Sequence, residues 1–271
     1  MKEVLTIEHQ GKKRQIQFEW QGQGDPENPT LVFLHQGLGS LESFKDIPKQ
    51  LSKACQCNTF TYSRLGYGQS DPISLPRKIN YLHVEALRIL PKILAAAKIK
   101  SHIIVGHSDG GSIGLIYAGS DRAKNLKAMV SLAAHVFCEP ITLKGIQKTK
   151  ERYQKGNLKS KLSRIHGQNT DTAFWGWNQV WLSPGFCHWN IERYLKSIDL
   201  PVLAIQGTMD PYGTQAQLKA MNKGIKNCKT WLLDHCYHDP FMEQPKQTLA
   251  AITQFLGSIL PEQIKTDQIK S

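Results

Sequence analysis

The sequence lacks any long apolar run. No stretch of its 271 residues approaches the roughly 18 consecutive apolar residues that a membrane-spanning helix needs, and its first residues lack the apolar core of a signal peptide. It also contains no internal repeat and no low-complexity segment. Since a chain of this length can bury a full hydrophobic core, we expect a cytoplasmic globular protein without a membrane span.

Cysteines and acidic residues are both few. The six cysteines are scattered without the paired spacing of metal ligands, and a chain of this length does not need disulfides, so we expect reduced thiols and no metal site. Lys and Arg number 34 against 22 Asp and Glu, which gives a net charge of +12. Such a charge favours acidic partners, but no nucleic-acid-binding motif accompanies it, so we expect no nucleic-acid partner.

Strand and helix patterns alternate along most of the chain. Alternating segments at 4–8 and 15–20 predict a hairpin at a sheet edge. Apolar runs predict strands at 31–34, 58–62, 103–105, 126–134, 201–205 and 229–233. Helical patterns predict helices at 41–53, 81–97 (interrupted at Pro91), 112–118, 214–223 and 245–260. The alternation predicts an α/β fold with a mostly parallel central sheet and helices on both faces.

The alternation stops between residues 135 and 199. We therefore predict a core of residues 1–134 and 200–260, a helical cap inserted at 135–199 over the carboxyl ends of the strands, and a polar tail at 261–271. Between residues 144 and 164 the insertion has eight cations and one acid. Five cations follow helical spacing and predict one basic stripe, either a partner-binding surface or a solvated face: Lys144, Lys148, Arg152, Lys155 and Lys159.

The second half of the insertion is rich in tryptophan. Four of the six tryptophans in the chain lie between residues 174 and 190. We predict that Trp175, Trp177 and Trp181 line an apolar substrate pocket. Packing of these side chains within the insertion is the alternative.

One short stretch predicts a nucleophile. The apolar run 103–105 leads into Gly106-His107-Ser108-Asp109-Gly110, in which glycines lie two residues before and two residues after the serine. Glycines at these points allow a sharp turn from a strand into a helix, with the hydroxyl of Ser108 exposed at its tip. A plain structural turn is the alternative.

A serine nucleophile needs a base and a carboxylate that orients the base. Asp210 and His238 each follow the end of a predicted strand, and the carboxyl ends of parallel strands meet at one edge of a sheet. The order serine, aspartate, histidine is also that of hydrolases built on such an elbow. His235 is a rival base, and the rival acids lie beside the histidine in sequence: Asp234 and Asp239.

An acyl-transfer reaction also needs donors for its oxyanion. The backbone N–H of Asp109 is one candidate, because it follows the nucleophile at a helix N-terminus. The second donor should come from the loop after strand 31–34, with Gly37 preferred and Leu38 as the alternative. The Asp109 carboxylate would repel the oxyanion unless it turned away, and His35 could brace the loop.

Together these motifs resemble the α/β-hydrolase superfamily along nearly the whole chain. Four stretches carry the resemblance: 35–39 (HQGLG), 64–70 (RLGYGQS), 106–111 (GHSDGG) and 238–245 (HDPFMEQP). The last is similar to the family's His-x-Pro-x-x-Glu-x-Pro ending, which favours His238 over His235. The chain departs from the family at Gln36 and at Cys236-Tyr237, where glycine is usual, and its Ser108 argues against the haloalkane dehalogenase branch.

The resemblance implies a serine hydrolase that cleaves a carboxylic ester through an acyl-enzyme, without metal or organic cofactor. Its small-molecule substrate could instead be a thioester, an enol-lactone or a compound cleaved at a carbon–carbon bond. The basic stripe beside an aromatic pocket also resembles pimeloyl-acyl-carrier-protein methyl ester esterases, which implies an acidic carrier protein as a partner. A non-catalytic small-ligand receptor is the alternative of another class.

Overall fold

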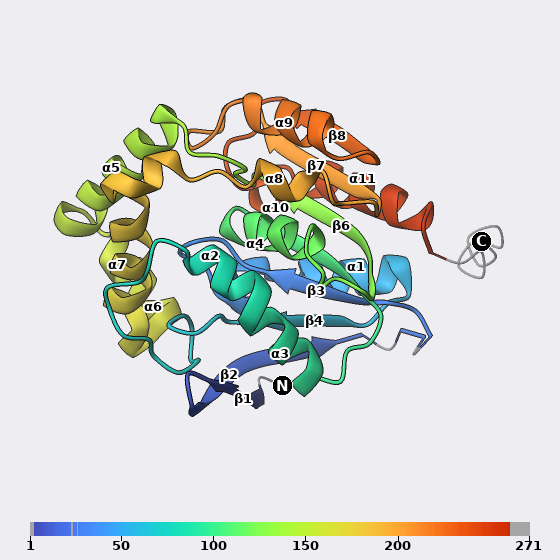
Figure 1. The fold of residues 1–271 in the computed structure, drawn as a ribbon, viewed down its shortest axis with the longest axis horizontal. Helices are drawn as coiled ribbons and strands as arrows, with labels where there is room; N and C mark the ends of the chain where they lie inside the picture. Colours follow the sequence, from blue (N-terminus) through green and yellow to red (C-terminus); the bar gives the residue numbers. More distant parts are fainter. Residues whose placement is uncertain (1–2, 23, 26, 261–271) are drawn as a thin grey trace.

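The computed structural model describes residues 3–22, 24–25 and 27–260, so the predicted tail at 261–271 lies outside it. Within these residues, eight strands form one sheet in the order β1-β2-β4-β3-β5-β6-β7-β8 (Figure 1). The β1–β2 and β2–β4 pairs are antiparallel, and all other neighbours are parallel. The predicted α/β fold and its edge hairpin are confirmed.

The strands lie close to the predicted positions. Their bounds are β1 (Glu3–His9), β2 (Lys12–Gln21), β3 (Thr30–Leu34), β4 (Thr59–Tyr62), β5 (His102–His107), β6 (Leu126–Leu132), β7 (Val202–Gly207) and β8 (Cys228–Leu233). Alternate side chains of the central strands point to opposite faces, because successive residues of a strand project in opposite directions. Val32 and Leu34 thus join the core on one face of the sheet, and Leu31 and Phe33 join the core on the other.

Helices cover both faces of the sheet. Their bounds are α1 (Ile47–Cys55), α2 (Tyr81–Val84), α3 (Leu90–Ala96), α4 (Asp109–Ala118), α5 (Pro140–Lys155), α6 (Leu158–His166), α7 (Thr170–Trp181), α8 (Glu192–Leu195), α9 (Ala216–Gly224), α10 (Pro240–Glu243) and α11 (Pro245–Gly257). Short helical turns are η1 (Leu41–Phe44), the π-helical η2 (Glu85–Ile89), η3 (Gly167–Asn169) and η4 (Pro184–His188). No helix in this part of the chain is long and apolar enough to cross a membrane.

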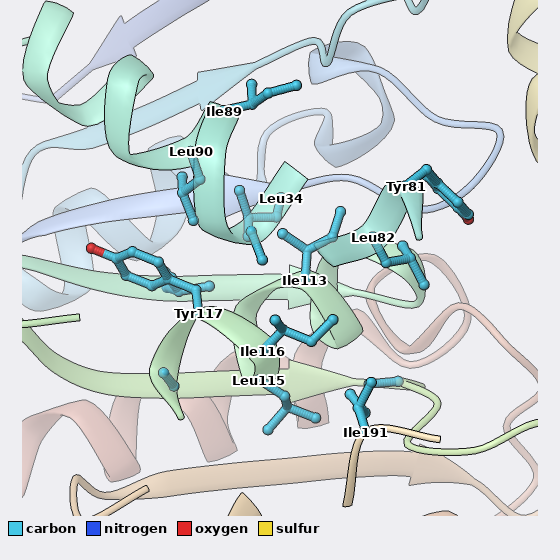
Figure 2. Close-up of a cluster of buried hydrophobic side chains, with 14 of the residues drawn as sticks. Leu34, Tyr81, Leu82, Ile89, Leu90, Ile113, Leu115, Ile116, Tyr117 and Ile191 are labelled. Carbon is cyan, nitrogen blue, oxygen red and sulfur yellow. The ribbon is translucent and has the colours of Figure 1, made fainter. Parts of the chain in front are cut away.

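Helix α4 lies at the centre of the larger core. Every residue from Asp109 to Ala118 is buried, because α4 packs on β5 and β6 and is covered by α2, η2 and α8. Figure 2 shows Ile113 and Ile116 of α4 among the side chains of this core. The smaller core lies on the other face, under α1 and α11. The nucleophile elbow therefore precedes a fully enclosed helix.

Two predicted helices are divided. The helix expected at 41–53 is a 3-10 turn followed by α1, because Lys45 adopts a φ of 47° and Pro48 lies in the first turn of α1. The helix expected at 81–97 consists of α2, η2 and α3, and Pro91 lies in the first turn of α3. The interruption that Pro91 predicts is thus present, and the break at Lys45 corrects the expected helix.

Residues 135–199 form α5 to α8, and α5, α6 and α7 lie beyond the carboxyl ends of the strands (Figure 1). The prediction that all five cations of the basic stripe share one helix is wrong. Helix α5 ends at Lys155, where Gly156 has an extended conformation (φ −110°, ψ −160°), and α6 starts at Leu158. Lys159 therefore lies on a different helix from the other four cations of the predicted stripe.

Truncating a side chain on α4 should test this packing. Ile116 is fully buried, so we expect Ile116→Ala to lower the free energy of unfolding by about 2–5 kcal/mol through lost apolar contacts and a cavity. Ile79 is 46% exposed, and Ile79→Ala should cost below about 1 kcal/mol. Urea denaturation followed by circular dichroism measures both values, and equal losses would contradict the central position of α4.

Candidate active site

The turn between β5 and α4 holds Ser108 in an unusual backbone conformation. Ser108 has φ 53° and ψ −117°, and its N–H donates a hydrogen bond to the carbonyl of Leu132 at 2.8 Å. A Cβ on Gly106 would lie 2.5 Å from the carbonyl oxygen of Gly110, and a Cβ on Gly110 would collide with the carbonyl of Leu34. Both glycines are therefore required by close backbone approach, as the sequence predicts.

The structure brings Ser108, His238 and Asp210 together in one hydrogen-bonded chain. Ser108 Oγ lies 3.0 Å from His238 Nε2, and His238 Nδ1 lies 2.9 Å from both carboxylate oxygens of Asp210. Asp210 follows the end of β7, and His238 lies in the loop between β8 and α10. Nδ1 must donate to the carboxylate, which leaves Nε2 free to accept the serine proton.

The rival residues lie elsewhere. His235 is exposed, and its backbone N–H donates to Thr208 Oγ1 at 3.1 Å. Asp239 accepts a hydrogen bond from the N–H of Met242 at the start of α10, and Asp234 is exposed. Of the sequence-predicted alternatives, His238 and Asp210 are the pair that meets Ser108.

Glu243 holds the loop that carries His238. Its carboxylate oxygens accept hydrogen bonds from the N–H of Tyr237 at 2.6 Å and from the N–H of Asp239 at 3.1 Å, on either side of the histidine. His107 adds a third contact, since its Nε2 donates to the carbonyl of His238 at 2.7 Å. These contacts hold a loop in which Cys236-Tyr237 replaces the usual glycine.

Burial and charge oppose each other at the histidine. Burial disfavours the imidazolium, but the facing Asp210 carboxylate and its hydrogen bond outweigh burial, so the pKa of His238 is raised. For Asp210, burial favours the neutral acid, yet His238 and the hydrogen bond to it lower the pKa of the carboxyl. The N–H of Tyr212 also donates to Asp210 Oδ1 at 2.8 Å. The pair is therefore built to stabilise an imidazolium–carboxylate state.

The predicted oxyanion donors lie beside Ser108. Asp109 is the first residue of α4, so its N–H has no acceptor within the helix. Gly37 and Leu38 both line the cavity at Ser108, and the choice between their N–H groups stays a prediction. A Cβ on Gly37 would collide with the indole ring of Trp177, which explains glycine at this position.

His35 and Arg64 brace the loop that carries these donors. His35 Nδ1 donates to the carbonyl of Gln36 at 2.8 Å, and His35 Nε2 accepts from the N–H of Arg64 at 3.0 Å. Burial and the nearby Arg64 cation hold the pKa of His35 well below its usual value, so the ring is neutral and can make both bonds. Arg64 Nη2 also donates to the Gln36 carbonyl at 3.0 Å.

A cavity of about 140 Å³ lies in front of Ser108. Its apolar wall comes from Ile146 of α5, Trp177 and Trp181 of α7, and Tyr212 after β7. The predicted role of Trp175 is wrong, because Trp175 does not line this cavity and instead packs against Tyr153 and Phe174, with ring centroids 5.7 and 5.0 Å apart. Trp177 and Trp181 are four positions apart on α7 and share a face of the helix. Trp175 is two positions before Trp177 and therefore projects from a different face.

His135 and Tyr212 are site residues that sequence reasoning missed. His135 lines the cavity, its Nε2 donates to the carbonyl of Tyr212 at 3.0 Å, and burial lowers its pKa. The Tyr212 ring lies 4.7 Å from the His238 ring between centroids. Both residues follow predicted strand ends, which is the one signal that could have marked them.

Among the described residues, no cluster of His, Cys, Asp and Glu could hold a metal ion.

The raised pKa of His238 can be measured directly. We expect His238 to titrate above the ordinary histidine value of about 6.5, and Asp210→Asn to move the titration to lower pH because the imidazolium loses its carboxylate partner. Proton NMR titration measures both, with the His238 signal assigned by its loss in His238→Asn. Asp121→Asn, at an exposed carboxylate, should leave the midpoint unchanged; a wild-type midpoint below 6.5 would contradict this account.

Comparison with known proteins identifies the fold. A family model described as alpha/beta hydrolase fold matches residues 29–183. A proline iminopeptidase of Lactobacillus acidophilus is 24% identical in an alignment 277 positions long, gaps included, which covers 86% of this chain and 91% of that protein.

Two solved structures illustrate the likeness in fold. The esterase RhEst1 from Rhodococcus sp. ECU1013 superposes with a TM-score of 0.71 at 17% identity, covering 96% of this chain and 99% of that chain. The enol-lactonase from Burkholderia xenovorans LB400 superposes with a TM-score of 0.68 at 17% identity, covering 90% and 96%. At these identities the structures are evidence for the fold and not for a substrate.

Proposed function

Because the chain belongs to the alpha/beta hydrolase family, we propose that this hydrolase cleaves a carboxylic ester through an acyl-enzyme formed on Ser108. The observation that carries the proposal is the hydrogen-bonded chain from Asp210 through His238 to Ser108, which ends at an apolar cavity. The reaction in this proposal needs no metal or organic cofactor, because its proton transfers and charge stabilisation can be supplied by side chains and backbone N–H groups.

In the first half of the proposed reaction, His238 Nε2 takes the proton of the Ser108 hydroxyl as Oγ attacks the ester carbonyl. Asp210 stabilises the imidazolium that forms. The carbonyl oxygen becomes an oxyanion, which accepts hydrogen bonds from the N–H of Asp109 and from the N–H of Gly37 or Leu38. His238 then gives its proton to the leaving alcohol.

In the second half, water replaces the alcohol. His238 removes a proton from the water as its oxygen attacks the acyl-enzyme, and the same oxyanion donors stabilise the second tetrahedral intermediate. The acid leaves when His238 returns its proton to Ser108 Oγ. In this proposal residues 135–199 are the cap, and Ile146, Trp177 and Trp181 contact the acyl chain.

Hydrolysis of an amide at a peptide N-terminus is a second candidate. It is supported by the relative named as a proline iminopeptidase, which matches most of this chain. The same residues could cleave an amide, since the acyl-enzyme is common to both reactions. Hydrolysis of a thioester, an enol-lactone or a carbon–carbon bond also fits this chemistry. A non-catalytic receptor would bind a small ligand in the cavity without turnover.

A fluorophosphonate probe tests the nucleophile. We expect the folded wild type to be labelled at Ser108 and Ser108→Ala to remain unlabelled, because the probe needs an activated serine. Ser160→Ala, at an exposed serine of α6, should be labelled like the wild type. Peptide mapping by mass spectrometry identifies the site, and folded wild type without label at Ser108 would overturn the hydrolase mechanism in favour of a receptor.

Substrate panels then separate the candidates. p-Nitrophenyl esters of increasing acyl length and aminoacyl p-nitroanilides, including the prolyl compound, should be compared by kcat/KM. Preference for esters supports the proposal. Preference for anilides with a free N-terminus would replace it with the peptidase.

The surface of α5 supports a further proposal about a partner. Helix α5 contributes Thr142 and Ile146 to the cavity and presents four exposed cations to solvent, namely Lys144, Lys148, Arg152 and Lys155. Lys159, on α6, is engaged by Asp171 at 3.0 Å. We propose that the exposed face of α5 binds an acidic carrier protein, because a carrier docked there would hold its acyl group near the cavity.

Charge reversal on α5 tests this partner. We expect Lys144→Glu with Lys148→Glu to lower kcat/KM for a carrier-linked ester more than about 10-fold and to change kcat/KM for a free p-nitrophenyl ester less than about twofold. Added salt should likewise lower kcat/KM for the carrier-linked ester more than for the free ester, because it screens the charges on α5. Lys223→Glu with Lys226→Glu makes the same charge change on and after α9 and should not discriminate between the substrates. Equal loss on both substrates, or the same loss in the control, would reject the carrier.

A further inference from the structure

The residue after the nucleophile carries a charge that opposes the reaction. Asp109 supplies a backbone N–H for the oxyanion in the proposed function, but its side chain is a carboxylate, and it is only 1% exposed. An oxyanion is also negative, and like charges interact strongly where water is excluded. The Asp109 carboxylate must therefore be held away from the oxyanion.

Tyr81 makes the contact that holds it. The Tyr81 hydroxyl donates to Asp109 Oδ2 at 2.6 Å and accepts from Trp181 Nε1 at 2.9 Å. Tyr81 begins α2 at the edge of the core cluster, and its hydroxyl points away from the other labelled side chains (Figure 2). Burial, followed by the Asp109 charge, raises the pKa of Tyr81 well above its usual value, so the hydroxyl keeps its proton and stays a donor.

Arg64 supplies the opposite charge but not the hydrogen bond. Its Nη1 lies 3.5 Å from Asp109 Oδ2 and has no hydrogen-bond partner among the described residues. Asp109 Oδ1 likewise has none within that part of the chain. In the described structure the Tyr81 hydroxyl is thus the side-chain donor that fixes the direction of the carboxylate.

The Asp109 carboxylate makes two stabilising interactions, although its charge would oppose the oxyanion. Asp109 lies in the first turn of α4, where a negative charge interacts favourably with the helix dipole. It is also the counter-ion of Arg64, whose guanidinium is fully buried and holds the Gln36 carbonyl. An unpaired buried cation would be strongly unfavourable, so the carboxylate is retained and must be oriented.

Resting on the proposed serine mechanism, we propose that Tyr81 is a positioning residue for the oxyanion site. Its hydroxyl keeps the Asp109 carboxylate turned from the oxyanion while the N–H of Asp109 faces it. Trp181, which lines the substrate cavity, fixes the Tyr81 hydroxyl in turn. The wall of the cavity and the charge next to the nucleophile are thereby joined by two consecutive hydrogen bonds.

A double-mutant cycle tests this role. In the wild-type background we expect Tyr81→Phe to lower kcat by about 10- to 100-fold and to change KM less than about twofold, because the freed carboxylate opposes charge that develops after binding. In the Asp109→Asn background the same change should cost less than about threefold, because no charge remains to be oriented. A merely structural tyrosine would give equal losses in both backgrounds.

Tyr153→Phe is the matched control. The Tyr153 hydroxyl also donates to a carboxylate at 2.6 Å, that of Asp171, but neither residue lines the cavity. This variant should keep kcat within about twofold of wild type. A loss in Tyr153→Phe as large as that in Tyr81→Phe would overturn the assignment.

Trp181→Phe covers the case in which Tyr81→Phe does not fold. It removes the donor to the Tyr81 hydroxyl and keeps the hydroxyl. We expect a kcat loss of about two- to fivefold that disappears in the Asp109→Asn background, whereas the smaller ring's weaker contact with the substrate should raise KM equally in both backgrounds. Equal kcat losses in the two backgrounds would refute the proposal.

The rate of fluorophosphonate labelling at Ser108 separates this inference from the proposed function. During labelling, Ser108 Oγ displaces fluoride from phosphorus through a five-coordinate state in which negative charge develops on the phosphoryl oxygen, and the reaction requires no knowledge of the natural substrate. The positioning role is supported, even if the ester panel fails, when Tyr81→Phe slows labelling in the wild-type background but does not slow it in the Asp109→Asn background. Unchanged labelling in Tyr81→Phe refutes it, whereas absent labelling in wild type refutes both proposals.

Discussion

The close backbone contact between the first turn of α4 and the end of β3 determines the rest of the site. Gly110 lies so close to the Leu34 carbonyl that no side chain fits between them. This approach places the N-terminus of α4 beside the loop that follows β3, so Asp109, Gly37 and Leu38 border the same cavity. Ser108 lies between these elements in a strained conformation that the surrounding backbone imposes.

Much of this arrangement could be predicted from the sequence, because it depends on order and on strand ends. Asp210 and His238 follow parallel strands of one sheet, and the sheet itself brings them to the edge where Ser108 lies. Glycine spacing around Ser108 similarly predicts the elbow, since only a close approach requires glycine at both positions. The α/β fold follows from apolar runs that alternate with helical patterns.

What could not be predicted depends on the conformation of single residues and on distant contacts. Lys45 adopts a left-handed φ, and no local pattern marks it as the point where the predicted helix divides. Gly156 ends α5 inside a basic run whose spacing continues beyond it, so the spacing alone predicts the wrong helix for Lys159. Tyr81 fits the apolar face of its helix, and its polar role arises from a partner 28 positions later in the chain, Asp109.

The planar guanidinium of Arg64 has a consequence for the shape of the site. It donates to the Gln36 carbonyl, on the loop after β3, and lies against the Asp109 carboxylate at the start of α4. One rigid group therefore spans the two segments that border the oxyanion site. The distance between those segments is therefore determined by the covalent dimensions of the Arg64 side chain as well as by the spacing of the strands. A shorter or more flexible cation at this position would change the width of the site without altering any group that faces the substrate.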